Sequence, residues 1–368
     1  MSVVEAEALV RKRNMIHRNH FNLLIIEGEI DMLNFDKSKY LEVTKGALSL
    51  REQAEFIIDE ISNKGFKNIF LIGSGGSIAI MYPFEYILNS TSTKPVYAKI
   101  AAEFMLMNDK HFGEESLVIL SSLSGTTQET VAAAKFCKEK GATTIGLVGY
   151  EKTPLGDLVD YKLVNFCEND FASDSINLQL YILIFRLMHN NNDFPEYDKF
   201  VSELQSIPEK LVAVKHVAEG KAEEFAQKYK DETYHMVVAS GNLWGKAYSY
   251  AMCVLEEMQW IRTKTIHAAE FFHGTLELVE EDTSILVLKG EDETVPLIER
   301  VEKFAEKYTN KLTVFDTKDY EMDGISEQFR GYLSPLIMGT VLQRLSVHLE
   351  DKRNHSLDLR RYYRTVAY

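Results

Sequence analysis

The sequence predicts an α/β protein that contains two doubly wound parallel sheets. Short apolar runs alternate with longer stretches in which apolar residues follow a helical period. This alternation is typical of βαβ units. It occurs twice, on either side of a helical segment, and 368 residues are enough for roughly two domains.

In the first half, the runs at 68–72 and 117–120 have the continuous apolar character of parallel strands that are buried on both faces. Pro83 is expected to bend the helix in which it lies. We expect strands at 68–72, 96–100, 117–120, 144–148 and 161–166, and helices at 50–64, 78–88, 128–140 and 176–189.

The second half repeats the order of elements, which suggests an internal duplication at the scale of a domain. We expect strands at 234–239, 284–288 and 312–315, and helices at 246–260, 296–307 and 335–349. We divide the chain into an N-terminal extension (1–47), a first domain (48–195), a helical linker (196–230), a second domain (231–350) and a C-terminal tail (351–368).

Composition restricts the classes of function. A net charge of −14 argues against nucleic acid as a partner, because binding phosphate backbones needs a basic surface. No apolar run approaches the ~20 residues that a membrane span needs. The three cysteines are scattered without metal-binding spacing, which suits a reducing, cytoplasmic location. We expect no metal or redox cofactor.

Two loops in the first half follow expected strands and begin helices. One is Gly75-Gly76-Ser77, and the other runs from Ser122 through Ser124 to Thr127. Each alone is explained as a set of helix caps. Because both follow strands of one parallel sheet, they are expected to meet at its carboxyl edge and to form an anion site. No lysine stands where a nucleotide-binding loop needs one, so a sugar phosphate fits better than a nucleoside triphosphate.

The helix expected at 246–260 carries a carboxylate at the border of its apolar stripe. On a helical wheel Glu257 lies beside Tyr250, whereas Glu256 lies opposite the stripe. Partial loss of hydration is expected to raise the pKa of Glu257 toward the range of a general base. His273 follows in a loop. The alternative is an amphipathic helix with one glutamate at its border, followed by a structural loop histidine.

These motifs resemble a known family. The loops 75–77 and 122–127 are similar to those of sugar isomerase (SIS) domains, and the segment 257–277 resembles the isomerase region of glucosamine-6-phosphate synthase. The segments 257–261 and 270–274 and the tail 360–363 are more similar still to fructosamine-6-phosphate deglycases. The resemblance implies two flavodoxin-like SIS domains, each a parallel sheet flanked by helices, in a homodimer with shared active sites.

The resemblance also implies roles for individual residues. Glu257 would be the catalytic base and His273, reaching the site from the neighbouring subunit, the acid. Glu270 would hydrogen-bond a sugar hydroxyl or brace its loop. Arg361 belongs to a basic tail that would complete the substrate pocket or remain solvated. Residues expected to bind substrate phosphate are Gly76, Ser77, Ser122, Ser124 and Thr127.

Two positions depart from the synthase pattern. Leu123 stands where the synthase has a glutamine, and Arg364 falls near its C-terminal lysine. Arginine does not readily release a proton, which makes a lysine-type role in ring opening doubtful. The function implied is hydrolysis of a phosphorylated sugar-amine, a 6-phosphorylated Amadori product, to glucose 6-phosphate and an amine. The alternatives are an aminosugar-phosphate isomerase or deaminase and a non-catalytic phosphosugar sensor.

Overall fold

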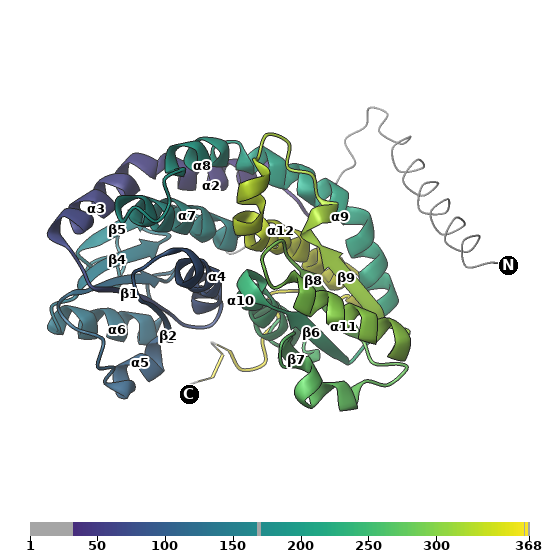
Figure 1. Ribbon diagram of the computed structural model, residues 1–368. Helices are drawn as coiled ribbons and strands as arrows, with labels where there is room; N and C mark the ends of the chain where they lie inside the picture. The colour runs from purple at the N-terminus through teal and green to yellow at the C-terminus, as the bar shows by residue number, and fades with distance from the viewer. Residues whose placement is uncertain (1–31, 168–170, 364, 367–368) are drawn as a thin grey trace. The chain divides into compact units, whose positions relative to one another are not determined.

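Two parallel β-sheets with helices packed against them organise the chain from residue 34 onward (Figure 1). The structure is a computed structural model, and it describes residues 32–167, 171–363 and 365–366. The predicted α/β class is confirmed. Most of the expected N-terminal extension, residues 1–31, lies outside the described residues.

The first sheet has five parallel strands in the order β2-β1-β3-β4-β5. Ile69 of the central strand pairs with Val96 on one side and with Leu117 on the other. This is the flavodoxin-like order, in which the crevice between β1 and β3 is the usual ligand site. The strands are β1 (Asn68–Gly73), β2 (Val96–Ile100), β3 (Ser116–Ser121), β4 (Thr143–Val148) and β5 (Tyr161–Val164).

Helices cover both faces of this sheet because its strands are apolar on both sides. Phe70 and Val118 point into a core with α5 and α6, where Phe104 and Ala133 are also buried. Helix α5 was not predicted, and α4 runs through Pro83 without ending. The helices are α3 (Arg51–Lys64), α4 (Gly76–Thr91), α5 (Ala101–Met107), α6 (Gln128–Glu139) and α7 (Ala172–Asn190).

A helix also forms within the expected N-terminal extension. Helix α2 (Lys37–Ser49) begins at Asp36, whose carboxylate accepts the backbone N–H of Lys39 at 2.9 Å. It packs against α7, and the buried Tyr40 hydroxyl donates to Asp174 at 3.0 Å. The boundary that we drew at residue 47 therefore falls inside a helix of the folded body.

The second sheet has four parallel strands in the order β7-β6-β8-β9. This order repeats that of the first four strands of the first sheet and supports the expected duplication. Strand β7 was missed, because five of its six residues are polar or charged and only Ile266 is buried. The strands are β6 (Tyr234–Ala239), β7 (Arg262–His267), β8 (Ile285–Lys289) and β9 (Leu312–Asp316).

The helices of the second half differ from our prediction at one important place. The helix expected at 246–260 is α-helical only as α10 (Trp244–Ser249) and continues as the π-helix η3 (Tyr250–Glu256). The N–H of Glu257 accordingly bonds to the carbonyl of Met252, five residues back, at 3.0 Å. The other helices are α8 (Tyr197–Leu204), α9 (Ile207–Tyr229), α11 (Val295–Tyr308) and α12 (Glu327–Arg353), with short turns η2 (Gly241–Leu243), η4 (Phe271–His273), η5 (Thr275–Leu278) and η6 (Thr317–Asp319).

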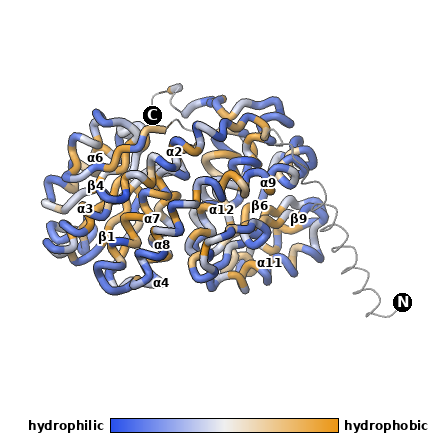
Figure 2. The backbone as a smooth tube through the Cα atoms, turned by 90° about the horizontal axis from the view of Figure 1, so that it is seen from above, coloured by the Kyte–Doolittle hydropathy of each residue, from blue (hydrophilic) through white to orange (hydrophobic). Residues whose placement is uncertain are grey.

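Helices α4 and α10 join the two halves (Figure 1). Pro83 has no N–H, so the carbonyl of Ala79 lacks its usual helical donor. Gly245 of α10 lies directly over this carbonyl. Figure 2 shows that hydrophobic residues gather in the central strand β1 and in α7. None of the described helices is both long and apolar enough to cross a membrane.

Candidate active site

The loops that follow β1 and β3 form a cradle for an anion. Because β1 and β3 are hydrogen-bonded neighbours, their carboxyl ends lie about 5 Å apart. Helices α4 and α6 begin at these loops, and no described side chain caps either of them. Their first N–H groups therefore point toward the crevice with the positive ends of two helix dipoles.

Hydroxyl groups line the cradle. Ser122 Oγ lies 2.9 Å from Thr127 Oγ1, and Ser124 Oγ accepts a hydrogen bond from the Thr126 hydroxyl at 2.9 Å. The buried Ser74 Oγ has no hydrogen-bond partner among the described residues. A buried hydroxyl without a partner is destabilising, and a bound anion would accept its hydrogen bond. Our prediction did not include Ser74, although it lies within the glycine-rich loop.

Positive φ angles shape both loops. Gly75 has φ of +56° and Gly125 has φ of +63°. A β-carbon at Gly125 would also overlap the side chain of Thr153. Both positions therefore require glycine. The structure thus brings the predicted residues of the two loops, Gly76, Ser77, Ser122, Ser124 and Thr127, to one edge of the sheet.

The matching loops of the second half are filled by a carboxylate of the chain itself. Asp292 follows β8, the counterpart of β3, and accepts the N–H groups of Asn242 and Thr294, each at 2.8 Å. The hydroxyls of Ser240 and Thr294 lie 2.7 Å apart. An internal anion thus takes the position that a phosphate would need. Of the two loop pairs, the one in the first half is left for a ligand.

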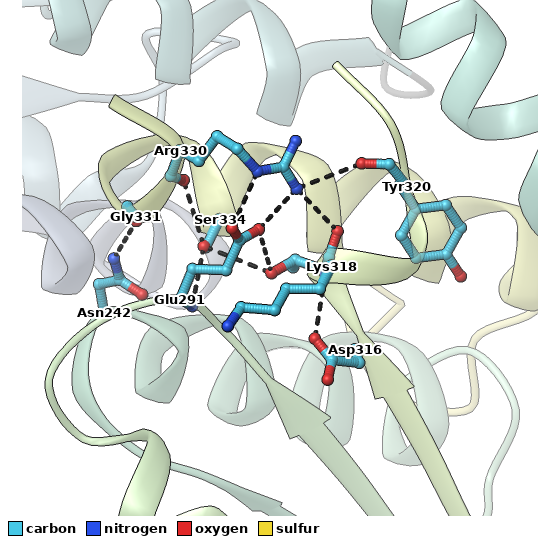
Figure 3. Close-up of polar contacts among 9 residues, drawn as sticks. Asn242, Glu291, Asp316, Lys318, Tyr320, Arg330, Gly331 and Ser334 are labelled. Carbon is cyan, nitrogen blue, oxygen red and sulfur yellow. Dashed lines mark hydrogen bonds and ion pairs between the residues drawn. The ribbon is translucent and has the colours of Figure 1, made fainter. Parts of the chain in front are cut away.

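The loop that carries Asp292 is held rigidly from its other side (Figure 3). Glu291 and Arg330 form a two-bonded ion pair with distances of 2.8 and 2.9 Å, and both side chains are largely buried. Arg330 also donates to the carbonyl of Thr317 at 3.2 Å, and Asn242 donates to the carbonyl of Gly331 at 2.7 Å. This network anchors the loop to α12.

Glu257 follows the π-helix and stands beside the cradle. A β-carbon placed on Gly76 would lie 3.9 Å from the sulfur of Cys253, one turn before Glu257. Burial raises the pKa of Cys253 to about 11, and the negative charge of Glu257 contributes to this rise. Cys253 thus lies between the loop 75–77 and the predicted base. π-Helical turns of this kind occur frequently at functional sites.

The carboxylate of Glu257 is paired with the C-terminal tail. Arg360 Nε lies 2.9 Å from Glu257 Oε1, and a quarter of the Glu257 side chain is exposed. The predicted base therefore lies in an ion pair with a residue of the tail. The prediction did not include Arg360 among the site residues, although it noted the basic character of the tail.

A groove of about 1170 Å³ extends from Glu257 along the tail. Arg361, which we predicted to bind substrate, lines it with its guanidinium 3.9 Å from the ring of Trp260. Trp260 adopts a positive φ of +56° and packs edge-on against His355. Arg364 lies outside the described residues.

His273 lies on the opposite face of the second sheet from Glu257. The segment after β7 packs with α11 against Met236 and Val238 of the central strand, through Phe271 in particular. Helix α10 instead packs against α4 and α12, and Cys253 of η3, which continues α10, faces Gly76 at the start of α4. Both Glu270 and His273 are exposed on their segment. The segment that leads to Glu257 and the segment that carries His273 therefore pack on different sides of the second sheet.

Two flavodoxin-like sheets with an anion cradle after β1 and β3 define a class of phosphosugar-binding proteins. The family model described as SIS domain matches residues 61–183, which contain this cradle. A Bacillus subtilis protein described as a phosphosugar isomerase has the same fold. Its TM-score is 0.82 at 35% sequence identity, over 88% of this chain and 99% of that one.

Relatives in sequence show to which branch of the SIS-domain family the chain is similar. Fructosamine deglycase FrlB of Bacillus subtilis is 36% identical over 336 residues, which cover 89% of this chain and all of the relative. Fructoselysine 6-phosphate deglycase of Escherichia coli is 24% identical over 311 residues, 83% of this chain and 88% of that one. The chain therefore belongs to the SIS-domain family, in the branch that includes these deglycases.

Proposed function

We propose that this chain is a fructosamine-6-phosphate deglycase, which hydrolyses a 6-phosphorylated Amadori product to glucose 6-phosphate and a free amine or amino acid. The observation that carries the proposal is the position of Glu257. Cys253, one turn before Glu257, faces Gly76 of the loop that we expect to bind phosphate, so a sugar anchored by its 6-phosphate would extend toward the carboxylate. The 36% identity to a fructosamine deglycase supports the same activity.

The reaction needs two proton transfers and one hydrolysis. Glu257 takes a proton from C1 of the ketoamine while an acid protonates the oxygen on C2, which gives an enaminol. Glu257 then returns the proton to C2, and the nitrogen becomes part of an imine at C1. Water adds to this imine and the amine leaves, so that C1 becomes the aldehyde of glucose 6-phosphate. One carboxylate can serve both transfers at adjacent carbons.

In this proposal the acid comes from a second copy of the chain. His273 of one protomer would approach Glu257 of its partner in a homodimer, because within one chain the segments that lead to these residues pack on different sides of the second sheet. Glu270, beside His273, would contact a sugar hydroxyl. Arg361 would contact the amine half of the substrate from the groove. We also propose a cytoplasmic location, which the free thiols of Cys137, Cys167 and Cys253 support.

The test measures release of glucose 6-phosphate from fructoselysine 6-phosphate and fructoseasparagine 6-phosphate, and release of fructose 6-phosphate and ammonia from glucosamine 6-phosphate as the comparison substrate. We expect Glu257→Gln to lower kcat by about 10³-fold, in the range of lost general-base catalysis, while phosphosugar binding is retained. Undiminished turnover in this variant would refute the mechanism. Faster conversion of glucosamine 6-phosphate than of either Amadori product would favour an aminosugar deaminase instead.

A further inference from the structure

The groove beside Glu257 has the chemistry of a carboxylate site. Six basic and four acidic side chains line it, whereas the whole chain carries a net charge of −14. Glu257 is one of the residues that line the groove, so a substrate whose sugar lies between the cradle and this carboxylate would place its amine half there. The following inference rests on the proposed function.

Among the basic residues of this groove, Arg360 forms the ion pair with Glu257. Its Nε faces the carboxylate at 2.9 Å, and its Nη1 donates to the carbonyls of Leu357 and Leu359 at 2.6 and 2.9 Å. The tail backbone thus holds the guanidinium in place independently of Glu257. Its position would persist if Glu257 turned toward the sugar.

The other basic groups near the tail have different principal contacts. Arg353 donates to the carbonyls of Lys230 and Gln259. Lys352 pairs with Glu223 and Asp351 outside the groove. Arg361 stacks on Trp260. Arg360 is therefore the guanidinium whose ionic partner is the predicted base itself.

The ion pair between Arg360 and Glu257 would hinder Glu257 as a general base. A carboxylate bonded to a guanidinium is stabilised in its charged form and is a weaker acceptor of the C1 proton. A carboxylate on the amine half of the substrate would compete for the same guanidinium, because arginine binds carboxylates strongly and in two-bonded geometry. An amino acid joined through its α-nitrogen carries that carboxylate only two bonds from the nitrogen, close to C1.

We propose that Arg360 exchanges Glu257 for the carboxylate of the amino-acid half of the substrate, and that this exchange frees Glu257 to act as the base. Arg360 is then a specificity-determining residue for fructosamine 6-phosphates that carry a carboxylate near the nitrogen. It also positions Glu257 in the empty site, with its carboxylate held away from the C1 proton until substrate arrives.

The test compares two substrates that differ only in charge, the 6-phosphates of fructose-glycine and fructose-glycinamide. For the unmodified enzyme we expect kcat/KM to be roughly 10- to 100-fold higher with the glycine adduct. In Arg360→Gln the ratio should fall to about one. Arg360→Lys should retain part of the preference, because it keeps the charge but loses the two-bonded geometry.

The pH profile separates an electrostatic role from a merely structural one. In Arg360→Gln the acidic limb of kcat/KM should move to higher pH, whereas in Arg360→Lys it should stay near that of the unmodified enzyme. Arg51→Gln is the control, since Arg51 pairs with Glu55 within α3 and lines no part of the groove. It should leave both the ratio and the profile unchanged.

The outcomes distinguish this inference from the function on which it rests. If the unmodified enzyme releases glucose 6-phosphate but Arg360→Gln keeps the same substrate ratio and the same pH profile, the exchange is refuted and the deglycase activity stands. If the unmodified enzyme acts on neither adduct nor on the lysine and asparagine adducts, the proposed function fails and the exchange fails with it.

Discussion

His235, at the scale of a single residue, couples the stability of the fold to pH without any part in the candidate site. It is fully buried on β6, its Nδ1 lies 2.7 Å from Ser284 Oγ, and Phe225 and Tyr229 pack against its ring. Burial lowers the pKa of His235 to about 4. An unfolded histidine has a pKa of about 6.5, so the unfolded chain takes up the proton first as pH falls.

The first stability prediction follows from this difference. The contribution of neutral His235 is fully present above pH 6.5 and is lost as pH falls through the window from 6.5 to 4. Between pH 7 and pH 5 the expected loss is about 2 kcal/mol. When His235→Phe is unfolded with urea at pH 7 and at pH 5, its free energy of unfolding should fall by about 2 kcal/mol less than that of the unmodified protein. Equal slopes in both proteins would contradict the prediction.

Gly125 provides a second residue-scale prediction, because its backbone and its surroundings both exclude a side chain. We expect Gly125→Ala to cost about 2 to 4 kcal/mol, from the positive φ and from overlap with Thr153. Affinity for inorganic phosphate should fall as well, since the loop 122–127 must shift. The control is Gly113→Ala, where a β-carbon meets no atom within 4 Å. Similar unfolding free energies for the two variants would argue against this account.

Single residues also show how far sequence reasoning reaches. The serines of the cradle could be located from local patterns, because hydroxyls that follow strands can be recognised within a few residues, whereas the role of Glu257 stays a prediction. Arg360 could not be paired with Glu257, because their contact depends on how the tail folds back after α12. Asp292 was missed for the same reason, since its role depends on N–H groups from the loop after another strand.

At the scale of elements, the contact between α4 and α10 determines where Glu257 stands relative to the cradle. A β-carbon on Gly245 would overlap the carbonyl oxygen of Ala79 and approach Pro83 Cδ at 2.9 Å. Both obstacles belong to a helix backbone or a rigid ring and cannot turn away. The distance between the two helices is therefore set by the glycine.

We accordingly predict that Gly245→Ala separates the helices, destabilises the protein by about 1 to 3 kcal/mol and lowers kcat more than KM changes. Gly220→Ala is the matched control, because Gly220 is an exposed residue within α9 with open space around it. There the alanine should stabilise the helix by up to about 1 kcal/mol. Thermal unfolding and steady-state kinetics of both variants provide the measurement, and a neutral Gly245→Ala would refute the interpretation.

The elements that sequence reasoning missed have two different physical causes. The helical wheel assumes an α-helical period, whereas η3 inserts extra residues per turn and rotates Glu257 relative to that wheel. Strand β7 lies at the edge of its sheet, so it lacks the two apolar faces by which the central strands were recognised. The central strands β1, β3 and β6 follow their predicted ranges closely, because burial on both faces leaves a strong apolar signal.

At the scale of the whole molecule, the duplication has produced unequal halves. The first half keeps its cradle for a ligand, whereas Asp292 fills the matching loops of the second half. In our proposal the second half supplies Glu257 and His273 instead. In a homodimer each chain would thus take part in two active sites. It would supply the base Glu257 to one site and the acid His273 to the other.

Mixing two inactive variants tests this arrangement. We predict that Glu257→Gln and His273→Gln are each nearly inactive as homodimers but recover activity when their chains are exchanged within dimers. A hybrid would contain one site with both intact residues and one with neither. Random exchange makes half of the dimers hybrid, so recovery should approach about one quarter of the unmodified activity. If Glu257 and His273 acted from the same chain, every site in a hybrid would lack one of them, and mixing would restore nothing.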